Sequence, residues 1–192
     1  FQTTPKKQEQ YAEILAEFYS HSAEVFVSQF SNCVYSVLLL KASGKVVTRL
    51  IQFIAASASR CNGNETIPPF APLLVDDLLA FTRAKDRIVR ARCLQIINEV
   101  LSHCKELDLE ERTIKKLKQV YMERSRDKVI AVRSAAATGL CMLQNPIEPD
   151  EDILKLVSTN MQYDPVGSIR VIYAERILVH PLTTDSIQSR LR

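Results

Sequence analysis

The sequence predicts an all-α fold, an α-solenoid in which antiparallel helix pairs stack on their neighbours. Three observations support this prediction. Related segments recur about every 40 residues, which is typical of helical arrays. Apolar residues within these segments follow the spacing of amphipathic helices. The composition, with four glycines, no tryptophan and 46% hydrophobic residues, suits a helical chain with a substantial core.

The clearest copy of the recurring segment starts at Asp127 and runs into a helix of small residues that reaches Leu143. Alanines and Gly139 on one face of that helix let a neighbouring helix approach closely. Similar segments start at Asp86 and Asp164. Each passes through a short turn to a β-branched residue followed by arginine, and then into an apolar helix. This pattern is the signature of HEAT-type repeats.

The arginines of the three segments recur at intervals of 43 and 37 residues. Each aspartate can cap the second helix of its own pair, because its carboxylate accepts hydrogen bonds from the free N–H groups there. Each arginine can reach the aspartate of the adjacent repeat. We therefore expect a structural ladder between repeats, made of Asp86, Arg90, Asp127, Arg133, Asp164 and Arg170.

The first helices are expected before the clearest repeats. Residues 9–30 form an amphipathic helix with a break near residues 20–22. Residues 34–40 continue as a buried piece, and residues 45–59 form a strongly amphipathic helix that looks like the second helix of a degenerate repeat.

The later helices follow in pairs, and the first of these pairs starts at Pro68 and Pro69, since proline is tolerated at a helix start. They are expected at residues 73–81, 88–104, 112–124, 129–143, 150–161 and 168–179, with a further helix starting at 180–185. The chain, residues 1–192, thus reads as one array of repeats at about 9–60, 68–104, 109–144 and 150–180. It starts with Phe1 and ends without a polar capping helix, so we expect part of a longer solenoid.

Chemistry-bearing residues are sparse. The five cysteines include no Cys-x-x-Cys pair and are expected to be buried thiols in a reducing compartment. The three histidines are isolated from acids at metal-ligand or catalytic spacing. No signal peptide is evident, and the apolar run at residues 34–40 is too short to span a bilayer. We therefore expect no enzyme, no cofactor, no metal site and no membrane partner.

The charge is unevenly distributed although the net charge is only +3. Basic residues gather in residues 41–60, 83–92 and 115–128, whereas acidic residues gather in the links between repeats. Basic positions from successive repeats can track a phosphate backbone without reading bases. Alternatively, the lysines of residues 115–118 form only a solvated helix face. The candidate DNA contacts, on second-helix faces and on one turn within a repeat, are Lys41, Lys45, Arg49, Arg92, Arg126 and Lys128.

Family-specific sequence is found in four stretches: Val89–Asn98 with the Glu-Val-Leu that follows, Arg126–Arg133 running on to Pro146, Lys45–Ile54, and Met161 to the turn at Pro181. These stretches resemble the CAP-G family, the HEAT-repeat subunit 3 of condensin. They occur in one colinear order, and the resemblance covers most of the chain from about residue 44 onward.

The resemblance implies a non-SMC subunit without ATPase activity, and specifically the N-terminal arm of a longer solenoid. Its implied partners are a CAP-H type kleisin subunit, double-stranded DNA held independently of sequence, and the SMC subunits indirectly through the complex. The implied localisation is the nucleus and mitotic chromosomes, with a cytoplasmic pool in interphase. The alternative is a HEAT-repeat adaptor that binds only proteins; an enzyme is the third possibility.

Overall fold

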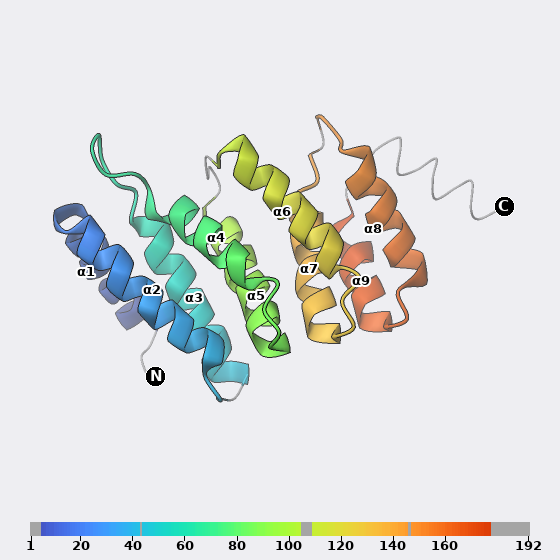
Figure 1. Ribbon diagram of the computed structural model, residues 1–192, viewed down its shortest axis with the longest axis horizontal. Helices are drawn as coiled ribbons and strands as arrows, with labels where there is room; N and C mark the ends of the chain where they lie inside the picture. The colour runs from blue at the N-terminus through green and yellow to red at the C-terminus, as the bar shows by residue number, and fades with distance from the viewer. Residues whose placement is uncertain (1–4, 43, 105–108, 146, 178–192) are drawn as a thin grey trace. The chain divides into compact units, whose positions relative to one another are not determined.

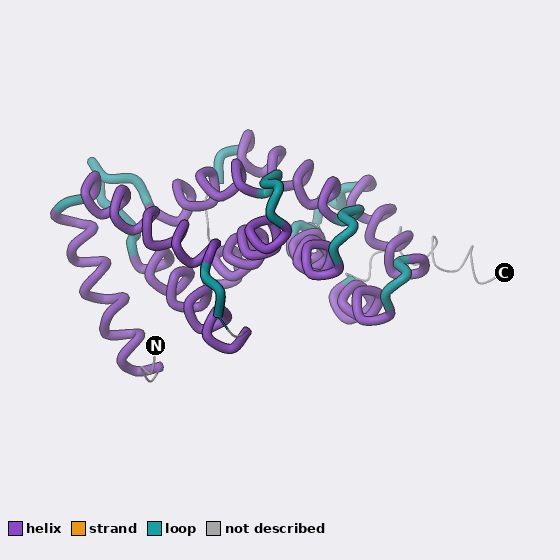
Figure 2. The backbone as a smooth tube through the Cα atoms, turned by 60° about the horizontal axis from the view of Figure 1, so that its bottom comes forward, coloured by secondary structure: helices purple, strands orange, loops and turns teal. Residues whose placement is uncertain are grey.

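The computed structural model describes residues 5–42, 44–104, 109–145 and 147–177. These residues form α-helices joined by turns and loops, with no strand among them (Figure 1, Figure 2). The chain divides into two compact units, Phe1–Glu110 (unit 1) and Glu111–Arg192 (unit 2). The predicted all-α fold of stacked HEAT-type helix pairs is confirmed. No helix in the described part is both long and apolar enough to cross a membrane.

Unit 1 begins with three consecutive helices, α1 (Pro5–His21), α2 (Ala23–Leu39) and α3 (Gly44–Arg60). The predicted break after residue 20 is confirmed, because Ser22 leaves the helical conformation with φ −148° and ψ 57°. The apolar piece expected at residues 34–40 is the last part of α2, where Val34 and Leu38 are buried. The range expected to hold the first repeat therefore contains three helices.

The remaining helices of unit 1 are α4 (Phe70–Phe81) and α5 (Arg87–His103). Proline 69 precedes α4 as its N-cap residue, in agreement with the predicted start. Helix α5 packs against α3, α4 and α2, and α1 packs against α3 and α2. Rings from three helices form an aromatic cluster in the core, and the phenol of Tyr19 donates to the Pro68 carbonyl at 2.6 Å. The cluster consists of Tyr19, Phe26, Phe30 and Phe70.

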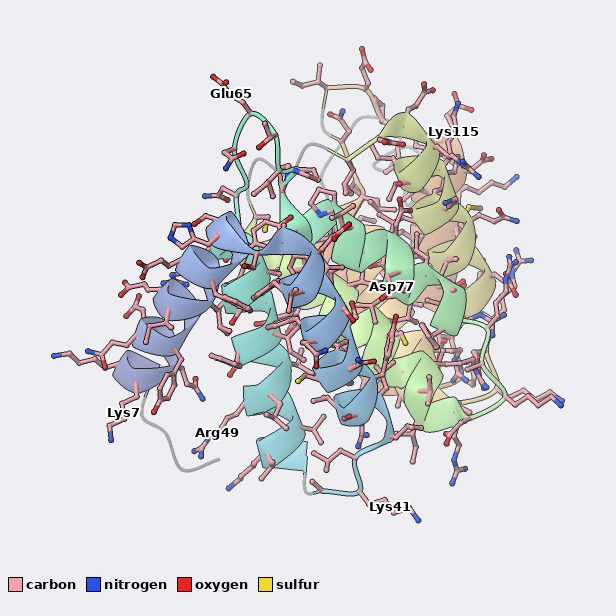
Figure 3. The ribbon with its side chains drawn as sticks, turned by 60° about the vertical axis from the view of Figure 1, so that its left-hand side comes forward. Lys7, Lys41, Arg49, Glu65, Asp77 and Lys115 are labelled. Atoms are coloured by element: carbon pink, nitrogen blue, oxygen red, sulfur yellow. The ribbon has the colours of Figure 1, made fainter. Side chains whose placement is uncertain are left out.

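A polar contact also joins α2 to α4. The hydroxyl of Tyr35 donates to Oδ2 of Asp77 at 2.6 Å, and this hydrogen bond raises the pKa of Tyr35 to about 12. Figure 3 shows Asp77 on α4, and its hydrogen bond with Tyr35 places it beside α2. Aromatic packing and this contact together fix the orientation of the first helices.

Unit 2 contains two helix pairs, α6 (Glu111–Arg124) with α7 (Ile130–Met142) and α8 (Glu151–Tyr163) with α9 (Gly167–Arg176). Helices α7 and α9 also pack against each other. Gly139 on α7 lies directly against the fully buried ring of Tyr121, so a methyl group at residue 139 would overlap that ring. The predicted close approach at the small-residue helix is confirmed. The helix expected at 180–185 and the end of the one expected at 168–179 lie outside the described residues.

Candidate nucleic-acid interface

The turns between paired helices share one backbone clamp. In each turn, Nη1 of the repeat arginine donates to the carbonyl six residues earlier. The acceptors are Ala84 for Arg90 at 2.8 Å, Asp127 for Arg133 at 3.0 Å and Asp164 for Arg170 at 2.7 Å. Because both groups belong to the same turn, the arginine fixes the path of the chain into the second helix.

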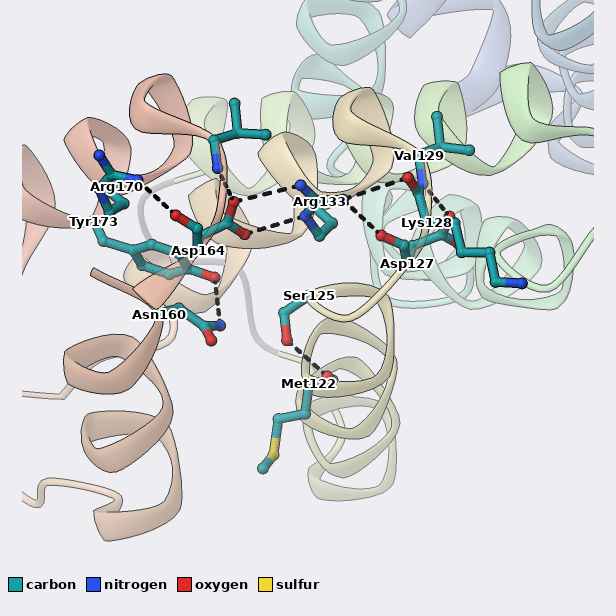
Figure 4. A network of polar contacts seen from close by, with 11 residues as sticks. Met122, Ser125, Asp127, Lys128, Val129, Arg133, Asn160, Asp164, Arg170 and Tyr173 are labelled. Atoms are coloured by element: carbon teal, nitrogen blue, oxygen red, sulfur yellow. Dashed lines mark hydrogen bonds and ion pairs between the residues drawn. The ribbon is translucent and has the colours of Figure 1, made fainter. Parts of the chain in front are cut away.

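The predicted ladder contact is present within unit 2. Nε of Arg133 donates to Oδ2 of Asp164 at 3.1 Å, and its Nη2 donates to Oδ1 at 3.4 Å (Figure 4). The side chains are only 12% and 5% exposed, respectively. Oδ1 of Asp164 also accepts from the backbone N–H of Val166 at 2.9 Å. The rung therefore links α7 to the turn before α9 through a nearly buried, charge-assisted contact.

The aspartates of the ladder are not equivalent, which corrects the prediction. Asp127, like Asp164, accepts from the N–H two residues later and stands two residues before the N-cap of the next helix. Asp86 is itself the N-cap of α5 and accepts from Ile88 at 2.7 Å. When the repeats are aligned on their arginines, Ala84 takes the place of the ladder acid in unit 1. Asp86 is thus a helix cap and not a ladder acid.

The first basic patch, named here the α3 patch, consists of Lys41, Lys45 and Arg49, all exposed. Lys45 and Arg49 are one turn apart on α3, on the side opposite its buried apolar residues. Figure 3 shows Arg49 and Lys41 near the same end of unit 1. None of the three side chains has a hydrogen-bond or ion-pair partner among the described residues. Their charges are therefore available to an external anion.

Arg92 was expected beside this patch, but it is only 9% exposed, so the prediction of a solvent-facing side chain is wrong. Its Nη1 donates to the carbonyls of Val37 and Leu38, each at 2.9 Å. These carbonyls belong to the last turn of α2, where the N–H donors of a continuing helix are missing; Val37 also accepts from the Leu40 N–H at 3.3 Å. Arg92 therefore satisfies the end of α2 and is removed from the set of DNA-contact candidates.

The second basic patch, the α6–α7 turn patch, consists of Arg126 and Lys128. Both are exposed, and neither side chain has a partner in the described part of the chain. They border a shallow hollow of about 360 Å³. Its other lining residues come from the two turns and from α7 and α8: Ser125, Asp127, Arg133, Asn160, Tyr163, Asp164 and Pro165.

Other lysines of α6 are engaged by acids. Nζ of Lys118 lies 2.6 Å from Asp150 and 3.2 Å from Asp152, and the hydrogen bond to Asp150 is the main reason that the pKa of Lys118 is raised. Lys115 pairs with Glu111 at 2.7 Å. These two lysines are already neutralised by ion pairs, whereas Arg126 and Lys128 have no side-chain partner among the described residues.

The α4–α5 turn carries cations that the candidate set omitted. Residues 83–85, Arg-Ala-Lys, occupy the same places relative to Arg90 as residues 126–128, Arg-Asp-Lys, occupy relative to Arg133. Lys85 is exposed and without a side-chain partner among the described residues. Aligning the two segments on their arginines, at the 43-residue interval, would have revealed this equivalence from the sequence.

The described residues contain no group of three or more His, Cys, Asp and Glu side chains able to hold a metal ion. The pKa values of the Cys61 and Cys93 thiols are raised to about 12, chiefly by burial.

Clamped turns and stacked helix pairs define a HEAT-repeat protein with two basic patches. No family model matches the chain. The chain is similar to condensin complex subunit 3 of Schizosaccharomyces pombe, with 25% identity over 176 residues, which cover 91% of this chain and 20% of that protein. The expected resemblance to this subunit is confirmed.

The fold is also that of a solved structure. The crystal structure of the S. pombe condensin Cnd3–Cnd2 subcomplex contains a chain that matches with a TM-score of 0.76 and 22% identity, over 97% of this chain and 25% of that chain. The chain thus spans a fifth to a quarter of the length of these relatives.

Proposed function

We propose that the chain is a segment of a non-SMC HEAT-repeat subunit of condensin, which holds double-stranded DNA independently of sequence and binds a CAP-H type kleisin. The similarity to condensin subunit 3 supports the condensin role. The S. pombe relative was crystallised as a Cnd3–Cnd2 subcomplex, which supports a protein partner within condensin. The proposed localisation is the nucleus and mitotic chromosomes, with a cytoplasmic pool in interphase, and contact with SMC subunits is indirect.

The observation that carries the DNA proposal is the α3 patch. Its three cations have no hydrogen-bond or ion-pair partner among the described residues, so contact with phosphates would break no ion pair that the structure describes. Such contacts release counterions and read no bases. The α6–α7 turn patch, together with Lys85, offers the same chemistry on other turns. Each patch is proposed to contact the DNA backbone in its own right.

The test is fluorescence anisotropy with unrelated DNA duplexes over a salt series. Replacing Lys45 and Arg49 by glutamate should weaken binding and reduce the slope of log K against log salt by about 2, since about one counterion is released per phosphate contact. The Lys6→Glu/Lys7→Glu variant makes the same charge change at exposed positions of α1 and should leave the slope nearly unchanged.

The Arg126→Glu/Lys128→Glu variant tests the turn patch in the same assay. If neither this pair nor the α3 pair changes the affinity, while circular dichroism shows intact helices, the mapped DNA contacts are refuted. A chain that binds a kleisin peptide but ignores DNA at physiological salt is instead a protein-only adaptor. Kleisin dependence is measured by repeating the DNA titration with the peptide present, where tighter binding is expected.

A further inference from the structure

Helix α1 carries an apolar stripe on its solvent side. Tyr11, Ile14 and Phe18 are 47%, 59% and 42% exposed, and the inner edge of the Phe18 ring packs against Phe26 of α2 at 6.2 Å between ring centroids. Their spacing of three and four residues places them in one line along about 10 Å of the helix. The opposite seam of α1 is already used, because Ala12 and Tyr19 are buried where α1 packs on α3 and α2. Figure 2 shows α1 at the edge of unit 1.

The stripe has an acidic border. Glu13 and Glu17 are exposed, one turn apart, and lie along the side of the stripe away from the buried seam. Neither side chain has a hydrogen-bond or ion-pair partner among the described residues. Apolar side chains in a line with unpaired carboxylates beside them are the features of a surface that receives an amphipathic helix.

We infer that this stripe is a docking surface for an amphipathic helix of a partner protein that carries lysine or arginine beside its apolar face. The apolar residues of the partner would cover Tyr11, Ile14 and Phe18, and its basic residues would pair with Glu13 and Glu17. Opposite charges beside an apolar seam set the choice of partner and its orientation. Neither DNA binding nor kleisin binding is needed for this contact.

A second copy of the chain fits this surface less well. In an antiparallel pair of α1 helices related by a two-fold axis, the same edge of each helix faces the other. Glu13 and Glu17 of one copy would then lie against the same residues of the second, where like charges repel. A basic partner removes this repulsion and supplies the missing countercharge.

The test uses a labelled 18-residue helical peptide with leucine at positions i, i+3, i+4 and i+7 and lysine beside them. A matched peptide carries glutamate in place of every lysine. Anisotropy titrations with the 192-residue chain should show the lysine peptide binding at least tenfold more tightly. The Glu13→Gln/Glu17→Gln variant should lose most of that preference.

The apolar contact is tested separately with Tyr11→Glu/Ile14→Glu, which leaves the contact between Phe18 and Phe26 in place. This variant adds negative charge, so simple attraction would strengthen binding of the lysine peptide, whereas loss of the apolar contact should weaken it at least tenfold. Ile114, 45% exposed on α6, provides the control, and Ile114→Glu should bind the peptide as the parent chain does. Circular dichroism verifies that both variants retain their helices.

Four results would overturn the inference. Equal binding of the lysine and glutamate peptides would show an unspecific apolar surface, and unchanged binding by Tyr11→Glu/Ile14→Glu would place the peptide elsewhere. A dimer in sedimentation velocity that this variant abolishes, without peptide binding, would make a second copy the occupant. Co-sedimentation with phosphatidylcholine vesicles that depends on the same residues, without peptide binding, would identify a lipid bilayer as the occupant of the stripe.

Discussion

Replacing Arg133 by alanine should destabilise unit 2 by about 3 kcal/mol. The change leaves the carboxylate of Asp164, 5% exposed, with the Val166 N–H as its only remaining donor among the described residues. Removing one member of a buried ion pair costs about 3–5 kcal/mol. The lower end applies because that N–H remains. The clamp on the Asp127 and Lys128 carbonyls is lost as well.

Urea unfolding followed by circular dichroism measures the loss in the free energy of unfolding. A double-mutant cycle shows how much of that loss belongs to the contact between Arg133 and Asp164. Asp164→Asn removes the charge but keeps an oxygen for Val166, so combining it with Arg133→Ala should recover about 1–2 kcal/mol of the loss. Arg112, exposed at the start of α6, provides a matched control, and Arg112→Ala should cost less than about 0.5 kcal/mol. A loss below about 1 kcal/mol for Arg133→Ala, or strict additivity in the cycle, would refute the reasoning.

Two further predictions concern packing and the thiols. Gly139→Ala should destabilise the chain by about 1–3 kcal/mol because its methyl group overlaps the Tyr121 ring. Gly44→Ala is the control and should be neutral or slightly stabilising, since its added methyl group meets no neighbouring atom within 4 Å. Equal melting temperatures of the two variants would contradict this prediction. At pH 8, Ellman's reagent should modify the exposed Cys33 first, since only a thiolate reacts and burial keeps the other thiols protonated. Fast modification of any buried thiol in the native chain would contradict this prediction. The protected thiols, with pKa values raised chiefly by burial, are Cys61 and Cys93, each to about 12, and Cys141, to about 11.

Local signals in the sequence were sufficient to predict most of the fold. Apolar periodicity located the helices, and Pro69 and Asp86 marked the starts of α4 and α5. The small face of α7 was predicted because Gly139 and its neighbouring alanines leave room for another helix. These features depend on residues within one or two turns of each other, so a single sequence reveals them.

Arg92 shows where local reasoning fails. Its position beside basic residues predicts a solvent-facing charge, yet the side chain lies between α5 and α2. Its acceptors, the Val37 and Leu38 carbonyls, are 55 and 54 residues away along the chain. Only the packing of α2 on α5 brings the carbonyls at the end of α2 to the guanidinium, and hydropathy carries no signal for that contact.

In the turns within the repeats, the residues that stabilise the turn differ from those that determine its surface charge. The clamp depends on one arginine and a backbone carbonyl, so it occurs whether the residue six places earlier is Ala84, Asp127 or Asp164. The carboxylate rung needs an acid at that place, and only the second and third turns have one. The flanking places lie seven and five residues before the arginine. The fifth place contributes only its backbone carbonyl to the clamp, as Lys85 and Lys128 do, so the side chains at both places can vary without removing an acceptor. They hold Arg and Lys at 83 and 85, Arg and Lys again at 126 and 128, and Tyr and Pro at 163 and 165. Basic side chains can therefore be gained or lost at each turn separately while the clamp stays the same. For this reason we expect charge reversal at Lys85, Arg126 and Lys128 to change DNA binding and leave the fold intact.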